Sequence, residues 1–241
     1  MKKTGPVAVL LNGADGKMGR AIERLITQHP ECGLLVTSRR ESDGQTCSLA
    51  PFDIVIDFST PQGAQEAFLL AKKYKKPLLT GTTNLPEPFL FKLQSEEKIP
   101  VFYAPNVSLS VYFFTELVRQ ACQMYKGYEK ALHEIHHVHK KDAPSGTAKR
   151  IADVMELPQE QVTYERIGET VGTHSAKLSS ELDEITITHR ATNRDLFAAS
   201  VLDIAQWLVT RRGGFYTMKD FANFKLKEKK KWKFTLLVLV V

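Results

Sequence analysis

The chain has 241 residues, of which 43% are hydrophobic, enough to bury the core of one large domain or of two smaller ones. Its formal net charge is +6, but part of this excess lies in residues 225–233, where six lysines accompany one acid. The rest of the chain is close to neutral, so the composition argues against a nucleic-acid-binding protein.

Cysteine content and hydropathy indicate the compartment. Cys32, Cys47 and Cys122 are scattered and form no CxxC pair, which fits a reducing cytosol better than a disulfide framework. Residues 1–6 lead into an apolar segment without a small-residue cleavage site, which predicts no signal peptide. No apolar run approaches the roughly 20 residues that a membrane span needs. We expect a cytoplasmic protein, or a plastid stromal one if it comes from a plant and lacks its transit peptide.

Short apolar runs and helical apolar spacing alternate over the first hundred residues. The apolar runs predict strands at residues 7–11, 34–38, 53–58, 78–83 and 101–106. One helix is predicted after the first strand, and another begins at Pro61, with an apolar face formed by Ala64, Ala67, Phe68 and Ala71. This alternation predicts an α/β fold with a Rossmann-type, doubly wound parallel sheet.

The pattern changes after residue 106. We predict a helix over about 111–125, a strand ending in several histidines, and a helix beginning at Gly146. Residues 171–178 and 184–189 alternate apolar and polar side chains, as antiparallel strands with one wet face do, and residues 196–209 are expected to be helical. We therefore place a second, α+β domain at 107–212 and assign 1–106 and 213–241 to the first.

A GxxGxxG pattern at Gly13, Gly16 and Gly19 follows the first predicted strand and opens a helix. A tight turn there brings backbone amides close to a pyrophosphate at a helix N-terminus, and Lys17 adds a cation. Asp15 stands where a stricter dinucleotide fingerprint has its second glycine. An ordinary strand-to-helix turn is the alternative, but the placement favours a dinucleotide site.

Arg39 and Arg40 follow the second predicted strand, whose end lacks the acid that would bind a ribose 2′-hydroxyl. Two arginines at this position suit a 2′-phosphate instead. The nearby Glu41 keeps a solvated basic loop as an alternative.

Residues 136–147 combine imidazoles and lysines with Pro144 and a Ser145-Gly146-Thr147 segment that can open a helix. Imidazole titrates near neutral pH, lysine donates protons and a helix N-terminus binds carboxylates, so the segment suits proton addition to a small acid. Ser145 or Thr147 can equally be a simple helix cap. Arg194 could clamp a second carboxylate bidentately.

The segment also matches HExxH at His133-Glu134-x-x-His137, which on a helix would place two zinc ligands one turn apart. A zinc hydrolase is therefore the alternative function. Pro144 would cut such a helix short, no third ligand is clear, and a zinc peptidase needs no dinucleotide-like half. If the segment is a strand, His136 and Lys140 share one face, and His137 and His139 the other. We expect no metal, and no role for His133 or His139.

At these residues the chain resembles the dihydrodipicolinate (4-hydroxy-tetrahydrodipicolinate) reductase family of diaminopimelate and lysine biosynthesis, up to about residue 221. The most specific match is His136-His137-x-x-Lys140-x-Asp142-Ala143-Pro144-Ser145-Gly146-Thr147-Ala148. Further matches are Gly13-x-x-Gly16-Lys17-Met18-Gly19, Asp57-Phe58-Ser59, Gly81-Thr82-Thr83, Ala104-Pro105-Asn106, Gly172-x-His174, the block 188–198 and Gly214-x-Tyr216.

The resemblance implies that NADPH or NADH delivers a hydride to a cyclic imine bearing two carboxylates. It implies an acid–base role for His136 and a proton-donor role for Lys140. The substrate-binding residues, with Ser145 added from its place at the helix start, are His137, Ser145, Gly146, Thr147 and Arg194. The implied cofactor contacts, with Arg39 and Arg40 added from their charge, are Gly13, Ala14, Asp15, Gly16, Lys17, Met18, Arg39, Arg40, Phe58, Ser59, Gly81, Thr82, Thr83, Ala104, Pro105, Asn106 and Val107. The resemblance also implies a homotetramer built through the sheet of the second domain.

The chain departs from the family pattern at Asn84, Val107 and Ser110, which bears on cofactor preference and rate more than on reaction class. The lysine-rich and then apolar tail, residues 225–241, is foreign to the pattern. It could add an edge strand, pack between subunits or contact anionic lipid.

Overall fold

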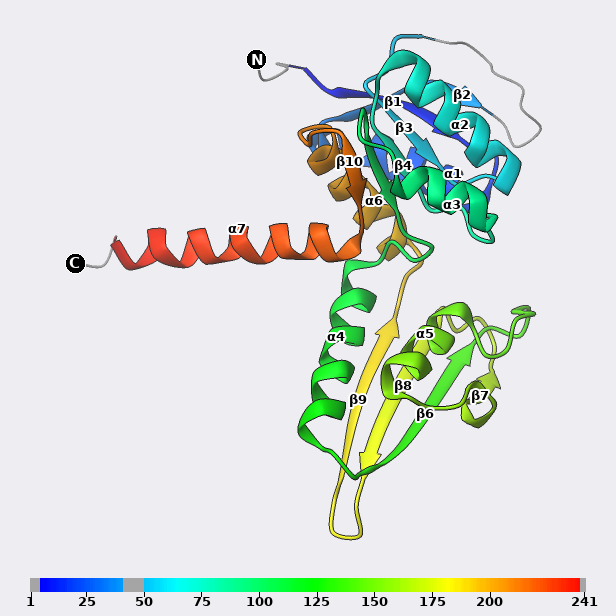
Figure 1. The fold of residues 1–241 in the computed structure, drawn as a ribbon, viewed down its shortest axis with the longest axis vertical. Coiled ribbons are helices and arrows are strands. Elements are labelled where there is room, and N and C mark those ends of the chain that lie inside the picture. Colours follow the sequence, from blue (N-terminus) through cyan, green and yellow to red (C-terminus); the bar gives the residue numbers. More distant parts are fainter. Residues whose placement is uncertain (1–4, 41–49, 239–241) are drawn as a thin grey trace. The chain divides into compact units, whose positions relative to one another are not determined.

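The computed structural model describes residues 5–40 and 50–238, and the chain divides into two compact units. Unit 1 comprises residues 1–107 and 197–241, and unit 2 comprises residues 108–196. Each unit is built on its own sheet (Figure 1).

Unit 1 contains a six-stranded, fully parallel sheet with the order β10-β5-β4-β3-β1-β2. Its strands are β1 (Val7–Asn12), β2 (Leu34–Arg40), β3 (Ile54–Asp57), β4 (Leu78–Thr80), β5 (Pro100–Tyr103) and β10 (Gly214–Tyr216). Its helices are α1 (Lys17–Gln28), α2 (Pro61–Tyr74), α3 (Glu87–Gln94), most of α6 (Asp195–Leu208), and α7 (Met218–Val238). The predicted Rossmann-type sheet is confirmed.

The strand order reverses beside β1, which places helices on both faces of this sheet. The chain steps from β1 to β2 in one direction and from β3 to β4 in the other. Because parallel crossovers are right-handed, α1 and α2 then cover opposite faces. Ligands of such sheets bind at the carboxyl ends of the strands beside this switch point.

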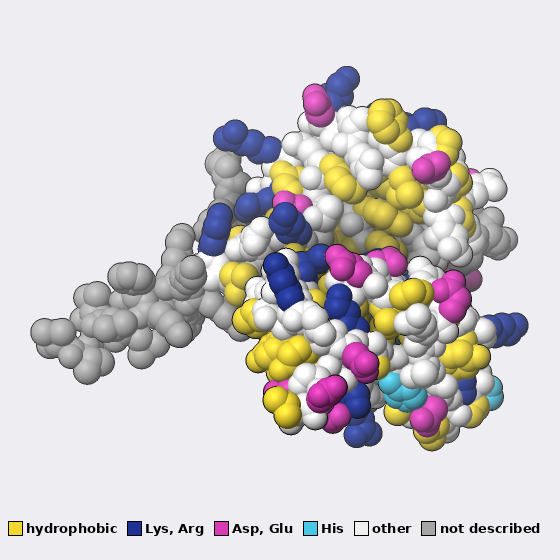
Figure 2. All heavy atoms as spheres, turned by 60° about the horizontal axis from the view of Figure 1, so that its bottom comes forward, with side chains coloured by type: hydrophobic (Ala, Val, Ile, Leu, Met, Phe, Trp, Pro, Cys, Tyr) yellow, Lys and Arg dark blue, Asp and Glu magenta, His cyan; other side chains and the backbone are white. Residues whose placement is uncertain are grey.

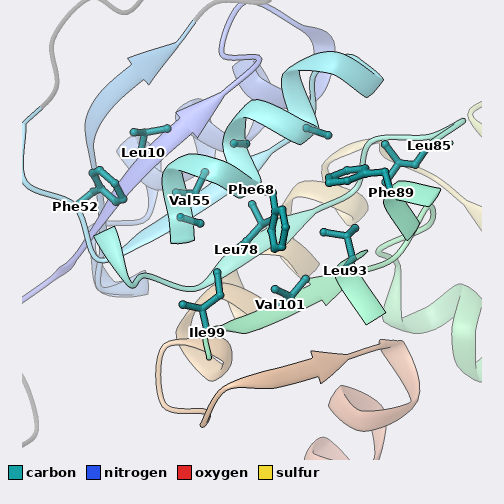
Figure 3. Close-up of a cluster of buried hydrophobic side chains, with 13 residues drawn as sticks. Leu10, Phe52, Val55, Phe68, Leu78, Leu85, Phe89, Leu93, Ile99 and Val101 are labelled. Carbon is teal, nitrogen blue, oxygen red and sulfur yellow. The ribbon is translucent and has the colours of Figure 1, made fainter. Parts of the chain in front are cut away.

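The two faces of the sheet have separate cores because side chains alternate along each strand. On one face, Leu10, Val55, Leu78 and Val101 pack against α2 and α3, which contribute Phe68, Phe89 and Leu93 (Figure 3). On the other face, the ring of Phe102 on β5 meets that of Trp207 on α6, with 6.3 Å between centroids. The inner strands β1, β3, β4 and β5 are therefore largely buried on both sides, as their apolar runs predict, whereas β2 and β10 at the edges are partly exposed.

Helix α6 belongs mostly to unit 1, although the expected second domain extended to residue 212. Trp207 explains this assignment: its ring packs against Phe102, Tyr216 and Phe221 of unit 1. The chain then returns to the sheet of unit 1, where β10 pairs with β5. The tail continues as helix α7 to residue 238, so the suggestion that it adds an edge strand is wrong for that segment.

Unit 2 packs two helices on one face of a four-stranded sheet with the order β7-β6-β8-β9. The elements are α4 (Leu109–Met124), β6 (Glu129–His136), α5 (Gly146–Met155), β7 (Thr163–Arg166), β8 (Gly172–Ser179) and β9 (Glu184–Ala191). Only β6 and β7 pair in parallel. The core lies between the helices and the sheet, and includes Phe114, Leu132, Ile151, Met155 and Ala176. The other face of the sheet is more exposed, as the alternating pattern predicts.

Among the described residues, no helix is long and apolar enough to cross a membrane. On the face presented in Figure 2, Lys and Arg side chains are interspersed with Asp and Glu side chains. The positive net charge is therefore not gathered into one patch on that face.

Candidate active site

The glycine turn after β1 leaves the N-terminus of α1 open. Gly16 is the N-cap residue, and no side chain caps the helix. Gly13 has a φ of 76°, and a Cβ there would stand 2.5 Å from the carbonyl oxygen of Phe58, so only glycine lets these two chain segments approach so closely. The first N–H groups of a helix lack intrahelical acceptors, and Lys17 and Met18 occupy that turn. Their amides suit a phosphate group.

The amides of the turn itself are already engaged. Gly13 and Ala14 both donate to the carbonyl oxygen of Arg40, at 2.8 and 3.2 Å, and Gly16 donates to that of Gly13 at 3.1 Å. These bonds fix the turn against the end of β2. Among the expected contacts, Gly13, Ala14 and Gly16 can therefore shape the site, while Lys17 and Met18 are better placed to donate to a ligand.

A buried carboxylate, that of Asp57 at the end of β3, joins the expected cofactor loops. Its Oδ1 accepts from the Asn12 amide at 2.6 Å and the Ser59 hydroxyl at 2.5 Å. Its Oδ2 accepts from the hydroxyls of Thr80 and Thr82, at 2.7 and 2.8 Å. The ends of β1, β3 and β4 are thus held together around one fully buried side chain. Sequence reasoning did not assign Asp57 a role.

The other expected cofactor residues follow β3, β4 and β5. The ring of Phe58 lies close to Gly81, Thr82 is buried and Thr83 is exposed. After β5, Ala104 and Val107 are buried and Pro105 is exposed, with Asn106 between these extremes. All of these residues lie in unit 1, at the carboxyl ends of its strands.

Both arginines at the end of β2 face carboxylates. The Nε of Arg39 lies 3.4 Å from Glu23 on α1, and Arg40 forms an ion pair with Glu66 on α2. A 2′-phosphate would have to share or replace these partners. Strand β2 itself contains no acidic residue that could bind a ribose 2′-hydroxyl, and its two charged residues are Arg39 and Arg40.

The histidine segment forms strand β6 and the loop after it, not a helix. Residues 133 and 137 are therefore about 13 Å apart along the chain, at about 3.3 Å per residue, instead of one helical turn. His133 lies on the outer side, where it contacts Thr163 and Glu165, whereas Glu134 is buried on the opposite side. The HExxH interpretation required both histidines on one helix face, so the zinc-hydrolase alternative is not supported.

Buried residues surround His136 at the end of β6. Its Nδ1 lies 3.3 Å from Oε2 of Glu134, and the same oxygen lies 3.5 Å from Nε2 of His174 on β8. Oε1 of Glu134 accepts from the Ser145 amide at 3.0 Å and from Arg166 of β7 at 3.1 Å. The carboxylate therefore joins the end of β6 to the start of α5.

The charge states of Glu134 and His174 follow from their burial and their contacts. Burial raises the pKa of the Glu134 carboxyl, but His136, His174 and Ser145 outweigh burial and hold that pKa well below its usual value. Burial lowers the pKa of His174, an effect that the neighbouring carboxylate only partly opposes. Glu134 is thus anionic and His174 tends to be neutral.

Helix α5 begins at Gly146 and is capped by Ser145, whose hydroxyl accepts from the Ala148 amide at 3.1 Å. Ser145 is buried, whereas Gly146 is exposed, with no atom within 4 Å of the position that a Cβ would take. Ser145 is therefore a helix cap. Binding of a carboxylate at the exposed start of the helix is compatible with that role and stays a prediction.

Two cations lie near this helix start. The Nζ of Lys140 donates to both oxygens of Asp142, at 2.8 and 3.0 Å, and Arg166 donates to the carbonyl oxygen of Asp142 at 2.7 Å. Arg194 is exposed. Burial lowers the pKa of His137, and the positive charge of Arg194 lowers it further. The expected substrate residues thus all lie in unit 2. Sequence reasoning missed Glu134 as a partner of His136, and it missed Arg166 because β7 was not predicted.

Family models match both halves of the chain. The model "Dihydrodipicolinate reductase, N-terminus" matches residues 7–107, and "Dihydrodipicolinate reductase, C-terminus" matches residues 110–222. A 4-hydroxy-tetrahydrodipicolinate reductase from Xanthomonas campestris pv. campestris is 38% identical over 233 residues, covering 90% of this chain and 98% of the relative. One from Campylobacter jejuni is 32% identical, covering 89% and 98%.

A solved structure with a similar fold is the dipicolinate-bound dihydrodipicolinate reductase from Paenisporosarcina sp. TG-14. Its TM-score is 0.71 at 16% identity, and the match covers 88% of this chain and 97% of that one. An amine dehydrogenase from Mycobacterium smegmatis aligns with a TM-score of 0.52 at 8% identity, covering 89% and 96%. At these identities both structures support the fold alone.

Proposed function

Since the chain belongs to the dihydrodipicolinate reductase family, we propose that it reduces 4-hydroxy-tetrahydrodipicolinate to tetrahydrodipicolinate in diaminopimelate and lysine biosynthesis. It is an oxidoreductase that uses NADPH or NADH. The observation that carries the substrate assignment is a grouping in unit 2. His136 and the N-terminus of α5 lie on the buried carboxylate of Glu134, and Lys140 is held by Asp142, whose carbonyl oxygen accepts from the same Arg166 that bonds Glu134.

Unit 1 offers a fitting site for the nicotinamide cofactor. The open first turn of α1, with Lys17 and Met18, suits the pyrophosphate, and Gly13 lets the turn pack closely against the backbone of Phe58. Arg39 and Arg40 suit a 2′-phosphate after exchange with Glu23 and Glu66. The bound cofactor supplies the hydride.

Unit 2 supplies the binding groups for a dicarboxylate. The N-terminal turn of α5, with Gly146 and Thr147, suits one carboxylate, and Arg194 with His137 suits the other. A substrate with two carboxylates can be oriented by two such contacts, which fixes the face of the ring that receives the hydride.

Reduction adds one hydride and one proton, so the chain must provide a proton. Lys140 carries an ammonium group held by Asp142, and His136 carries an imidazole beside the anionic Glu134. We assign proton donation to Lys140 and acid–base support to His136. Lysine and histidine are both among the side chains that serve as general acids or bases in enzymes.

We also propose that the protein is a cytoplasmic homotetramer assembled through the outer face of the unit 2 sheet. This face is not covered by α4 or α5, whose apolar residues pack on the other side. Size-exclusion chromatography with light scattering measures the assembly, and a monomer would contradict the proposal.

The function is tested by oxidation of NADPH and NADH with substrate freshly made from pyruvate and aspartate semialdehyde. Turnover that depends on this substrate is expected. His133→Ala is a matched control for His136→Ala, because both histidines lie on β6 but face opposite sides. Activity lost equally in both variants, or absent from the unaltered protein, would contradict the assignment.

A further inference from the structure

The buried carboxylate of Glu134 divides its contacts between two sets of groups. Oε1 faces donors that hold it in place, the Ser145 amide and the Arg166 guanidinium. Oε2 faces two imidazoles, those of His136 and His174. Glu134 is fully buried, and a buried charge is tolerated only when it is paired and hydrogen-bonded. The geometry therefore holds one carboxylate oxygen in place beside the imidazole of His136.

The ring of His136 is fixed from two sides. Nδ1 and Oε2 of Glu134 are 3.3 Å apart; they are not aligned as a hydrogen bond, but both atoms are buried and neither has another hydrogen-bond partner among the described residues. On the other side, a Cβ on Gly172 would stand 3.0 Å from Nε2. Gly172 thus leaves the space that the Nε2 side of the ring occupies. The ring of His174 packs edge-on against it, with 5.2 Å between centroids and 74° between planes. A carboxylate at one ring nitrogen favours the proton at that nitrogen and leaves the other as the acceptor.

We propose that Glu134 is a positioning residue for His136: its carboxylate keeps a proton on Nδ1, so that Nε2 is the atom that exchanges a proton during turnover. Arg166 and the Ser145 amide hold Glu134 in place for this task. The turnover part of the inference rests on the proposed function, whereas the position of the proton on the ring does not.

A bound metal is the competing use of these groups. Donor atoms of Glu134, His136 and His174 all lie within 4.8 Å of one another, and all three residues are buried. The guanidinium of Arg166 bonds to the same carboxylate, which places a positive charge next to any such ion. That charge favours the proton over the cation, because a second cation there would be repelled.

The direct test is the ¹⁵N chemical shifts of histidine-labelled protein, prepared without metal, with the His136 signal assigned by its absence from His136→Asn. In the unaltered protein at mildly alkaline pH, Nδ1 is expected to be protonated and Nε2 unprotonated. In Glu134→Gln the amide replaces the carboxylate with little change in volume, and the proton is expected to shift towards Nε2. An Nε2 proton in the unaltered protein, or the same tautomer in both proteins, would overturn the proposal.

Kinetics provide a second readout. Glu134→Gln is expected to lower kcat by roughly 10- to 100-fold, the range typical of lost orienting partners, while KM changes by less than about threefold. Glu134→Asp, which keeps the charge, should recover part of kcat. Glu165→Gln is the matched control: it removes an exposed carboxylate 3.4 Å from His133 on the outer side of the sheet, and its kcat should stay within about twofold.

A further variant guards against misfolding of Glu134→Gln. Gly172→Ala leaves Glu134 intact but crowds Nε2, so it should lower kcat while the proton stays on Nδ1. Stoichiometric zinc in the purified protein, with activity lost on chelation, would overturn the proposal in favour of the metal. An inactive but correctly protonated protein would refute the proposed function and leave the tautomer assignment standing.

Discussion

Asp57→Asn should destabilise the protein and weaken cofactor binding together. Each carboxylate oxygen of Asp57 accepts two hydrogen bonds, and asparagine replaces one oxygen with an NH₂ donor. Two bonds to a charged group are therefore lost, each typically about 1.5–3 kcal/mol. Hydroxyls can rotate and recover part of this, so we expect a net loss of about 3 kcal/mol. At roughly 2–4 °C per kcal/mol for a chain of this size, Tm should fall by about 6–12 °C.

Cofactor affinity should fall by about tenfold or more, because the ends of β1, β3 and β4 lose their common anchor. Thermal unfolding by circular dichroism and titration of NADPH by protein fluorescence measure the two effects. Asp53→Asn is the matched control: this carboxylate precedes the same strand and accepts from the Ala8 amide at 2.9 Å, far from the cofactor loops. Unchanged Tm and affinity in Asp57→Asn, or an equal loss of affinity in Asp53→Asn, would refute the reasoning.

Four further outcomes are expected. NADPH should bind at least as tightly as NADH, with a difference in affinity that decreases as the salt concentration rises, and Arg39→Glu should reverse the order. Fluorescence titration of both cofactors at low and high salt measures these affinities, and a preference for NADH that does not depend on salt would contradict the expectation. His136→Ala and Lys140→Ala should each lower kcat by about two to four orders of magnitude, whereas Arg194→Ala should act mainly through KM, as steady-state kinetics would show. Because folding depresses the pKa of Glu134, this carboxyl stabilises the protein above the ordinary value of 4.5, and that contribution is lost as the pH falls below it. As the pH falls below 4.5, the free energy of unfolding should therefore decrease more steeply for the unaltered protein than for Glu134→Gln. Denaturant unfolding at a series of pH values measures this, and an equal pH dependence in the two proteins would contradict the anionic state of Glu134. Removal of metal ions by a chelator should leave turnover unchanged, and lost activity restored by zinc would contradict this.

The parts of the fold that the sequence predicted are those with strong local patterns. Apolar runs located the buried strands β1 to β5, and the face of α2 was identified residue by residue as Ala64, Ala67, Phe68 and Ala71. Period-two alternation located β8 and β9. Such patterns arise because one element buries a regular set of side chains, and they need no knowledge of the remaining chain.

Two strands that were missed depend on distant partners. Strands β7 and β10 are four and three residues long, and each is stabilised by pairing with a strand far away in sequence. Missing β7 also hid Arg166, which holds Glu134 from across the sheet. Likewise, nothing local indicates that Asp57 gathers donors from the ends of three strands. The HExxH match carries no such information, because the segment forms the predicted strand, β6, and pairs with β8.

Transfer of deuterium from the cofactor to the substrate tests the central claim most directly. NADPH carrying deuterium on the transferred position of its nicotinamide is incubated with fresh substrate and the protein, and the product is analysed by mass spectrometry. The account predicts one deuterium, not exchangeable with water, in each tetrahydrodipicolinate formed. With His136→Ala the product should carry the same label, but its amount over the same time should be about 100-fold lower or less. Product without deuterium, or labelled cofactor left unconsumed beside intact substrate, would contradict it.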